Sequence, residues 1–199
     1  MSGSAGWELG VSRVAPWELV VESWELTVIE TRNPFAPAGV GDMFLAVKGA
    51  RSGPIKGESQ DDVHKGEIEV LSWSWGMQAK PSLGGGQATG KPSVHDLKIL
   101  KRVDCASTAL MSALKTNEPI QKAVLTLRKA GSAQLEYLKI IIEQGRVTSL
   151  VIEAGDREGG PDLLERITFS FNKITVEYVP QGKDGLAQGA TQFSDEWGG

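Results

Sequence analysis

Short apolar runs of strand character, separated by turn residues, fill the chain from residue 43 onward. Glycine, proline and acidic clusters bound these runs, as they bound strands in all-β proteins. One segment, residues 104–118, instead carries the apolar spacing of a helix. About seven strands and a single helix predict a mainly β fold, a compact antiparallel β-barrel or sandwich with one flanking α-helix. The expected strands are 43–49, 66–77, 94–103, 123–130, 133–143, 147–154 and 163–181.

In two of the expected strands the alternation of apolar and polar residues shifts by one position partway along. In residues 66–77 the apolar positions are first Ile68 and Val70, and then, on the other parity, Leu71, Trp73 and Trp75. The last strand changes from Ile167, Phe169 and Phe171 to Ile174, Val176 and Tyr178. Because successive side chains of a strand point to opposite faces, each change indicates a bulge or a strand covered on different faces along its length.

Turn and capping residues predict the connections. Gly131-Ser132 favours a hairpin between 123–130 and 133–143, residues 144–146 a short turn, and residues 155–162 a loop. In the helix we expect Asp104 or Ser107 as the N-terminal cap and Pro119 as the stop signal, with an apolar stripe of Leu110, Met111 and Leu114. The polar, glycine-rich residues 182–199 are expected to form a tail.

The charge of the chain is unevenly distributed. Residues 1–42 contain six acids and two bases, while the remaining residues contain 19 of each and sum to zero. A body with no basic stripe argues against nucleic acid as a partner. Near-zero charge suits a subunit that packs against its own copies. No apolar stretch reaches the length of a membrane span, so membrane insertion is not expected.

Residues 1–42 differ from the rest of the chain. They repeat the tripeptide W-E-L at 7–9, 17–19 and 24–26, at spacings that match no repeat architecture. We interpret 1–42 as an N-terminal extension, poorly structured or produced by a misassigned start before Met43, and 43–199 as the β domain. The alternative is a functional segment, such as a plug or a docking arm. The first residues also lack the basic and apolar regions of a secretory signal.

A glycine cluster at 82–93 comes within one residue of a phosphate-binding loop. From Gly85 it reads G-G-Q-A-T-G-K-P, but Pro92 stands where the magnesium-binding hydroxyl belongs. A phosphate loop must also lead into a helix, whose N-terminus faces the phosphates, and a strand is expected here instead. A flexible loop between two strands is the better interpretation.

The sequence shows no other group of residues with the spacing of a catalytic or metal site. His64 and His95 are expected to be solvated or structural, because zinc needs three or four ligands and a single cysteine is present. Cys105 has no histidine nearby in sequence to act as its base and is expected to be a small buried residue. The carboxylate pairs Asp61-Asp62 and Glu67/Glu69 read as solvated charge. We therefore expect no cofactor and no enzymatic activity.

The triplet W-S-W has a clear two-sided pattern. Trp73 and Trp75 share one face of their strand and are expected to be core residues. Ser72, Ser74 and Gly76 share the other face, so Ser74 is predicted to face water or a cavity.

These segments together resemble the Hcp family, the tube-forming proteins of type VI secretion. The resemblance covers roughly residues 43–195. It is carried by K-G-E-S (56–59), H-K-G-E-I-E-V-L-S-W-S-W-G-M (64–77), G-K (90–91), D-L (96–97), A-L-M (109–111), L-T-L-R-K-A-G (125–131), E-Y-L (136–138), L-L-E-R-I-T-F-S-F (163–171) and V-E-Y-V-P-Q (176–181).

The resemblance implies a homo-hexameric ring with a wide channel. Such rings stack into a tube inside a contractile sheath, with a spike protein at the tip and effector proteins in the lumen. It implies a cytoplasmic protein that is secreted on firing without a signal peptide. Ser72 and Ser74 would face the lumen. The extended loop would contact the neighbouring ring through Ser82, Gly84, Gly85, Gly86, Gln87, Gly90 and Lys91.

Other classes remain in competition at this stage. A tail-tube subunit of a phage or of another contractile injection machine would share the barrel and the ring. A β-sandwich binding module or an enzyme with a cryptic site would not form rings.

Overall fold

The computed structural model describes residues 41–79, 92–129, 135–157, 160–182 and 186–197, all within a compact unit that spans Pro37–Gly199. The expectations for residues 1–40 and for the loop 80–91 lie outside the described residues. The chain order of the elements is β1 (Met43–Gly49), β2 (Gly53–Ile55), β3 (Ile68–Glu69), β4 (Ser72–Ser74), β5 (Met77–Gln78), β6 (Ser93–Val94), β7 (Leu97–Arg102), α1 (Ala106–Lys115), β8 (Pro119–Arg128), β9 (Glu136–Arg157), β10 (Gly160–Ser170), β11 (Lys173–Tyr178) and β12 (Thr191–Glu196).

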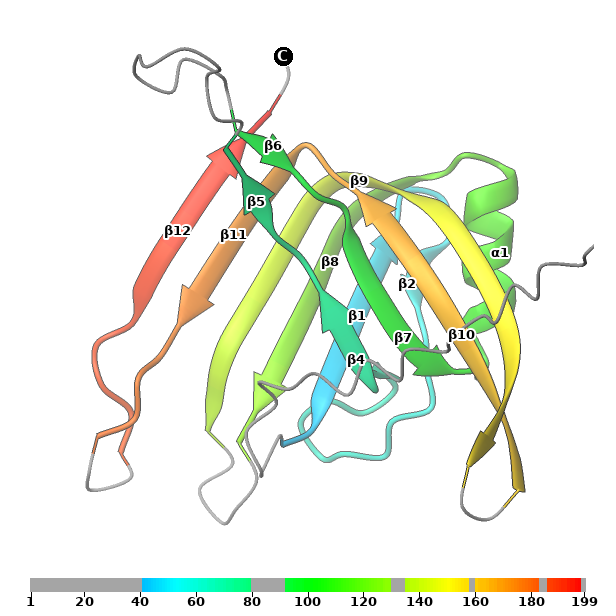
Figure 1. The fold of residues 1–199 in the computed structure, drawn as a ribbon, viewed down its shortest axis with the longest axis horizontal. Helices are drawn as coiled ribbons and strands as arrows, with labels where there is room; N and C mark the ends of the chain where they lie inside the picture. The colour runs from blue at the N-terminus through cyan, green and yellow to red at the C-terminus, as the bar shows by residue number, and fades with distance from the viewer. Residues whose placement is uncertain (1–40, 80–91, 130–134, 158–159, 183–185, 198–199) are drawn as a thin grey trace, which may run out of the picture. The chain divides into compact units, whose positions relative to one another are not determined.

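Ten of these strands form one antiparallel sheet, as predicted. Its main path runs β2-β1-β8-β9-β10-β7-β4, with β3 on β1, β11 on β9, and β12 on β11, while β5 and β6 pair separately. Figure 1 shows β7 and β10 in a layer in front of β1 and β8, with α1 beside the bend of β9. Among the described residues no helix is long and apolar enough to cross a membrane.

The segment 68–74 closes the sheet into a barrel. Its first residues pair with β1, and the Val70 N–H donates to Met43 O at 2.9 Å. The Leu71 N–H then donates to Leu100 O at 2.8 Å, and β4 continues along β7. The segment thus pairs first with β1, near one end of the sheet, and then with β7, near the other end. This change of partner explains the change of parity between Val70 and Leu71, because the chain turns there.

The second change of parity marks a break in what was predicted as a single strand. β10 pairs with the distal half of β9, and β11 pairs with the proximal half of the same strand. The two strands therefore run in line along β9, and they are interrupted at Phe171 and Asn172. The interruption moves Ile174 onto the core face, where it is fully buried.

The turn predicted at 144–146 is wrong, because β9 runs through it as one strand of 22 residues. Gln144 adopts a φ of 54°, and the strand bends there instead of reversing. A glycine follows because the backbone of β10 lies close: a Cβ on Gly145 would be 2.6 Å from Ser170 O. The hairpin predicted between β8 and β9 is confirmed by their antiparallel pairing.

Two more segments that were expected to be irregular contain strands. The loop predicted at 155–162 is wrong, because β9 and β10 continue their pairing out to Arg157 and Gly160. The expected tail contains β12, which pairs with β11 along its whole length. Polar composition concealed both elements, since the residues of β12 are all exposed.

Helix α1 begins and ends close to the predicted residues. The N-cap position is occupied by Cys105, whose side chain makes no capping hydrogen bond, so the prediction of Asp104 or Ser107 as the cap is wrong. Asp104 Oδ1, one residue before the cap, accepts the Ala106 N–H at 2.9 Å, and Ser107 Oγ, inside the helix, accepts the Asp104 N–H at 3.1 Å. Pro119 opens β8. The buried face is Ala106, Ser107, Leu110 and Ala113, with Leu114 packed at its margin.

A buried charge pair joins α1 to the barrel. Lys101 on β7 and Glu165 on β10 are both fully buried, and Lys101 Nζ lies 2.7 Å from Glu165 Oε2. Lys101 Nζ also donates to Asp104 Oδ1 at 2.6 Å and to Ser107 Oγ at 3.0 Å, and the Ser107 hydroxyl donates to Glu165 at 2.7 Å. The helix start is therefore held by one ion pair whose members come from two strands.

Candidate functional site

Residues from four distant segments meet beside the ends of β1 and β8. Arg128, at the end of β8, is almost completely buried, and its Nη2 donates to Asp42 Oδ2 at 2.7 Å and to Asp61 Oδ2 at 2.6 Å. The guanidinium also lies 5.1 Å from the ring centroid of Phe44 on β1. We call these residues, with His64, Glu67 and Glu136, the motif cluster, because three segments of the sequence resemblance (64–77, 125–131 and 136–138) supply four of its seven members.

His64 stacks on the ring of Phe44. The two rings stack with centroids 4.3 Å apart and planes within 13°. His64 Nδ1 lies 3.0 Å from Glu67 Oε2, and Nε2 lies 3.3 Å from Glu136 Oε1 without hydrogen-bond alignment. The expectation of a structural histidine fits this packing, since the ring is buried between an aromatic face and two carboxylates.

The cluster shifts the pKa of two carboxylates. The hydrogen bond from Arg128 lowers the pKa of Asp61 from 3.8 to about 2, and the N–H groups of Val63 and His64 add to this effect. Burial would raise the pKa of Glu136, but Lys139, whose Nζ lies 2.6 Å from Glu136, lowers it. Asp61 and Asp42 in turn raise the pKa of the Arg128 guanidinium, and the hydrogen bond to Asp61 has the larger effect.

Glycines of the motifs allow the loop 56–67 to lie against the barrel. A Cβ on Gly57 would be 2.4 Å from Glu67 O, so no larger residue fits there. Gly66 has a φ of 74°, a conformation that side chains disfavour. The side chain of Glu58 reaches the helix, where its Oε1 accepts the Cys105 N–H at 2.9 Å. The motif residues K-G-E-S and H-K-G-E therefore hold the loop in place.

The structure orients the W-S-W triplet as predicted. Trp73 and Trp75 are half-buried and pack against the core, while Ser72 and Ser74 are exposed. Ser74 lines an open hollow of about 410 Å³ with Met77, His95 and Lys98 among its neighbours. The predicted stacking-loop residues, from Ser82 to Lys91, lie outside the described residues.

The structure contradicts the expectations for Asp61, Glu67 and Cys105. Asp61 and Glu67 are not simply solvated, because Arg128 binds Asp61 and His64 contacts Glu67. Cys105 also differs from its prediction. It is exposed, not buried, and its thiol donates to Lys56 O at 3.1 Å. The residue immediately precedes the first turn of α1, while the buried stripe begins one residue later at Ala106. Sequence could not reveal this, because the burial of a cap residue depends on how the helix sits on the sheet.

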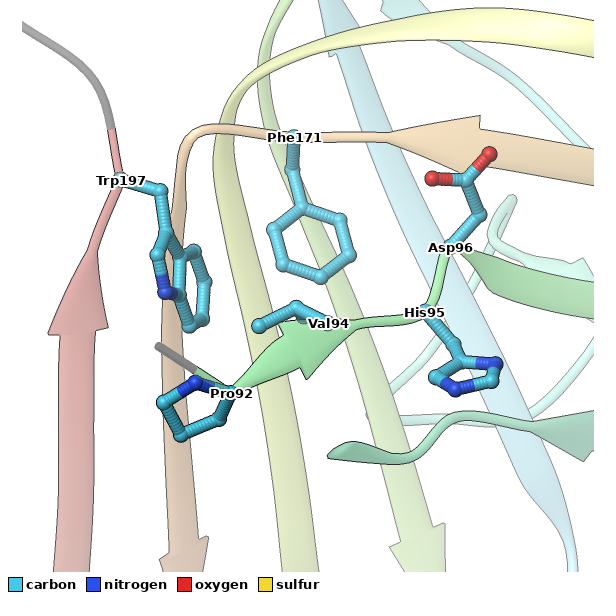
Figure 2. Close-up of a pocket in the computed structure, with 6 residues that line it drawn as sticks. All are labelled: Pro92, Val94, His95, Asp96, Phe171 and Trp197. Carbon is cyan, nitrogen blue, oxygen red and sulfur yellow. The ribbon is translucent and has the colours of Figure 1, made fainter. Parts of the chain in front are cut away.

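A second hollow, of about 250 Å³, lies beside the end of β12 (Figure 2). Trp197 and Phe171 form its aromatic wall, with ring centroids 5.9 Å apart. Figure 2 shows the side chains of His95 and Asp96 pointing away from each other, so they do not form an acid–base pair. Within the described ranges no three His, Cys, Asp or Glu side chains are grouped to hold a metal ion. Trp197 was missed because its segment carried no strand pattern.

The fold and the motif cluster define a class of protein. It is an antiparallel β-barrel with one flanking helix, in which the signature residues bind one another and fix the protein's own loops. Signature residues of this kind specify a shape, since Arg128 and Glu67 are bonded to side chains of the same chain.

Comparison with known proteins identifies the family. The profile of the family described as "Type VI secretion system effector, Hcp" matches residues 44–178. Protein hcp1 of Pseudomonas aeruginosa is 40% identical over 151 residues, which cover 74% of this chain and 89% of that protein. The crystal structure of Hcp1 from Salmonella typhimurium superposes with a TM-score of 0.64 at 33% identity, covering 79% of this chain and 95% of the other. A type VI secretion system effector from Yersinia pestis gives a TM-score of 0.60 at 32% identity, covering 78% and 99%.

This chain therefore belongs to the Hcp family of the type VI secretion system, a family of tube proteins and not of enzymes. The match includes the cluster residues from Phe44 on β1 to Glu136 on β9, while Asp42 lies just before it.

Proposed function

We propose that this chain is the structural subunit of a type VI secretion tube. Six copies form a ring, the rings stack within a contractile sheath behind a spike protein, and effector proteins travel in the channel. The observation that carries the proposal is the 40% identity to protein hcp1, which extends over 89% of that relative. No separate catalytic domain is required by this role, because the work of export is mechanical.

Ser72 and Ser74 are the proposed channel-lining residues. They are exposed, small and polar, and they alternate with tryptophans that anchor the opposite face in the core. A surface of this kind suits transient contact with varied effectors, because small hydroxyl side chains neither bind strongly nor obstruct. The loop residues Ser82, Gly84, Gly85, Gly86, Gln87, Gly90 and Lys91 remain the proposed contact between stacked rings.

The protein would act first in the cytoplasm and then outside the cell. Export by contraction takes the assembled tube in one step, so no signal peptide is needed. The balanced charge of residues 43–199, with 19 acids and 19 bases, supports close packing of identical subunits.

The ring itself is the first prediction to test. Sedimentation velocity of the purified chain should give a species of six times 21.3 kDa, about 128 kDa, and negative-stain electron microscopy should show rings with an open centre. A chain that stays monomeric across micromolar concentrations, with no rings in the images, would contradict the proposed function.

A further inference from the structure

The serine face of β4 continues across three neighbouring strands. Ser74 pairs with Lys98 on β7, and Lys98 pairs with Thr168 on β10. Thr168 pairs in turn with Ser149 on β9. Residues that pair directly across antiparallel strands lie on the same face of the sheet. The surface that includes Ser74 is therefore the whole outer face of β4, β7, β10 and the adjoining part of β9 (Figure 1), here called the channel face.

Two basic side chains of the channel face are already paired. Arg102 and Arg166 lie on this face, because the alternation of β7 and β10 places them on the side of Lys98. Arg102 Nε lies 3.0 Å from Asp162 Oδ2. Arg166 Nε lies 3.1 Å from Glu153 Oε2. Each guanidinium is thus bound to a carboxylate of its own chain.

Lys98 differs from both arginines. Its side chain is exposed, and within the described ranges no carboxylate forms an ion pair with its ammonium group. Asp96, two residues earlier in the chain, instead accepts the Thr148 hydroxyl at 3.5 Å. The channel face therefore carries at Lys98 a cation that its own chain does not neutralise.

The unpaired cation lines a hollow with polar and apolar walls. Lys98 and Ser74 border the open hollow of about 410 Å³ together with Met77, whose side chain is 47% exposed. Among the described residues that line it, His95 and Asp96 are the other ionisable groups. An ammonium and a hydroxyl beside a thioether suit a carboxylate side chain that has an apolar neighbour.

We propose that the hollow around Lys98 selects cargo proteins that present an acidic segment to the channel. A glutamate or aspartate side chain of the cargo pairs with the Lys98 ammonium and accepts the Ser74 hydroxyl, and an apolar side chain next to it packs on Met77. This inference rests on the proposed function, because only a ring turns the channel face toward a cargo.

The strength of this contact depends on the number of copies in the ring. A single exposed ion pair is weak, because water and salt screen it. Six copies place six such hollows around one channel, so a flexible acidic segment engages several of them at once and gains avidity. The segment is then retained as a whole, while each separate contact stays weak enough to release.

Peptide binding to the purified ring tests the inference. The probe is a fluorescein-labelled peptide of Glu-Leu-Ser repeats, and the controls are Gln-Leu-Ser and Lys-Leu-Ser repeats of the same length. Fluorescence anisotropy at low salt should show the Glu peptide bound about tenfold more tightly than the Gln peptide, with the Lys peptide weakest of the three. High salt should remove the preference, since the hollow is open to water.

Charge variants locate the binding site. Lys98→Gln should lose the preference for the Glu peptide over the Gln peptide, whereas Asp96→Asn should increase it, because that change removes the carboxylate of the hollow. The matched control is Lys122→Gln, which removes the same charge from an exposed residue of β8 outside the hollow and should bind as the wild type. A ring of Lys98→Gln that keeps the full preference contradicts the site.

The outcomes separate this inference from the proposed function. If the wild-type chain forms rings that bind the Glu and Gln peptides equally, the inference is wrong and the tube function stands. A single-stranded oligonucleotide that binds as tightly as the Glu peptide would also overturn it, since the hollow would then select polyanions in general and not an acidic protein segment. If the wild-type chain forms no rings, the proposed function itself fails, and this inference fails with it.

Discussion

In the described part of the chain four charged side chains are buried, Lys101, Glu118, Arg128 and Glu165, and each is bound by groups from elsewhere in the sequence. Glu118 Oε1 accepts the N–H groups of Arg51 and Ser52, which lowers the pKa of the carboxyl. At the scale of single residues, then, charge serves to fix loops and the helix start, because a buried charge is tolerated only in the arrangement that satisfies it.

The Lys101–Glu165 pair yields a prediction on stability. Glu165→Leu alone should lower the free energy of unfolding by about 3–5 kcal/mol, because it removes the fully buried carboxylate that binds the Lys101 ammonium and leaves only Asp104, at the margin of the core, to pair with it. The double variant Lys101→Met with Glu165→Leu should recover most of the loss. Urea denaturation measures both. A double variant no more stable than Glu165→Leu would show that the pair itself, and not the orphaned charge, carries the stability.

Asp61 yields a prediction on pH. Its pKa is about 2 in the fold and 3.8 ordinarily, so its stabilising effect is present above pH 3.8 and is lost as the pH falls toward 2. Asp61→Asn should therefore lower the urea midpoint at pH 6 and lessen its decline across this acid window. Asp62→Asn is the matched control, since the neighbouring side chain is exposed and should behave as the wild type. Equal declines in all three chains would contradict the role of Asp61.

At the scale of elements, β9 organises the barrel. One strand pairs with β8, β10 and β11, and the irregularity at Gln144 and Gly145 bends it so that both halves find partners. The bend explains why β10 and β11 can follow β9 in line. It also explains why β11 and the outer half of β10 pair with opposite ends of the same strand.

Gly145 is the element-scale test of this bend. Gly145→Ala places a Cβ 2.6 Å from Ser170 O, so it should destabilise the fold by about 1–3 kcal/mol, as overpacking against backbone does. Gly76→Ala is the control, since nothing lies within 4 Å of a Cβ there. Thermal unfolding compares the two. A melting temperature for Gly145→Ala equal to that of the control would show that β10 can move away from β9.

At the scale of the whole molecule, the assembly decides which surfaces matter. Ser72 and Ser74 lie on one face of β4, opposite the half-buried Trp73 and Trp75. A hydroxyl-lined face acquires a role only when several copies enclose it. The orientation of each subunit in the ring is therefore the quantity to measure.

A heavy label at Ser74 reports that orientation. In a Cys105→Ser background, which removes the exposed native thiol, Ser74→Cys labelled with a gold maleimide should give density in the central channel of the ring by electron microscopy. The side chain is exposed, so the substitution should leave the ring and the stability unchanged. Gold on the outer rim would exclude Ser74 from the lumen.

Much of the fold was predictable from local pattern. Strand β1 and helix α1 follow from apolar spacing and turn signals, which depend on neighbours in sequence. The two changes of parity marked places where an expected strand is interrupted: the chain changes partner from β1 to β7 after Val70, and it breaks at Phe171 and Asn172 while staying on β9. The failures at 144–146 and 155–162 share one cause: residues that favour turns were overruled by pairing with β10.

By itself, the sequence determined the class of fold, the family resemblance and the two-sided face of W-S-W, since periodicity and motifs are local properties. Only the tertiary structure decided that residues 68–74 close the barrel, that β9 is continuous, and that Cys105 is exposed. It alone brought Phe44, His64, Arg128 and Glu136 into one cluster. The reason is physical: these features consist of contacts between residues far apart in the chain, whose energies exceed the local preferences that a sequence pattern records.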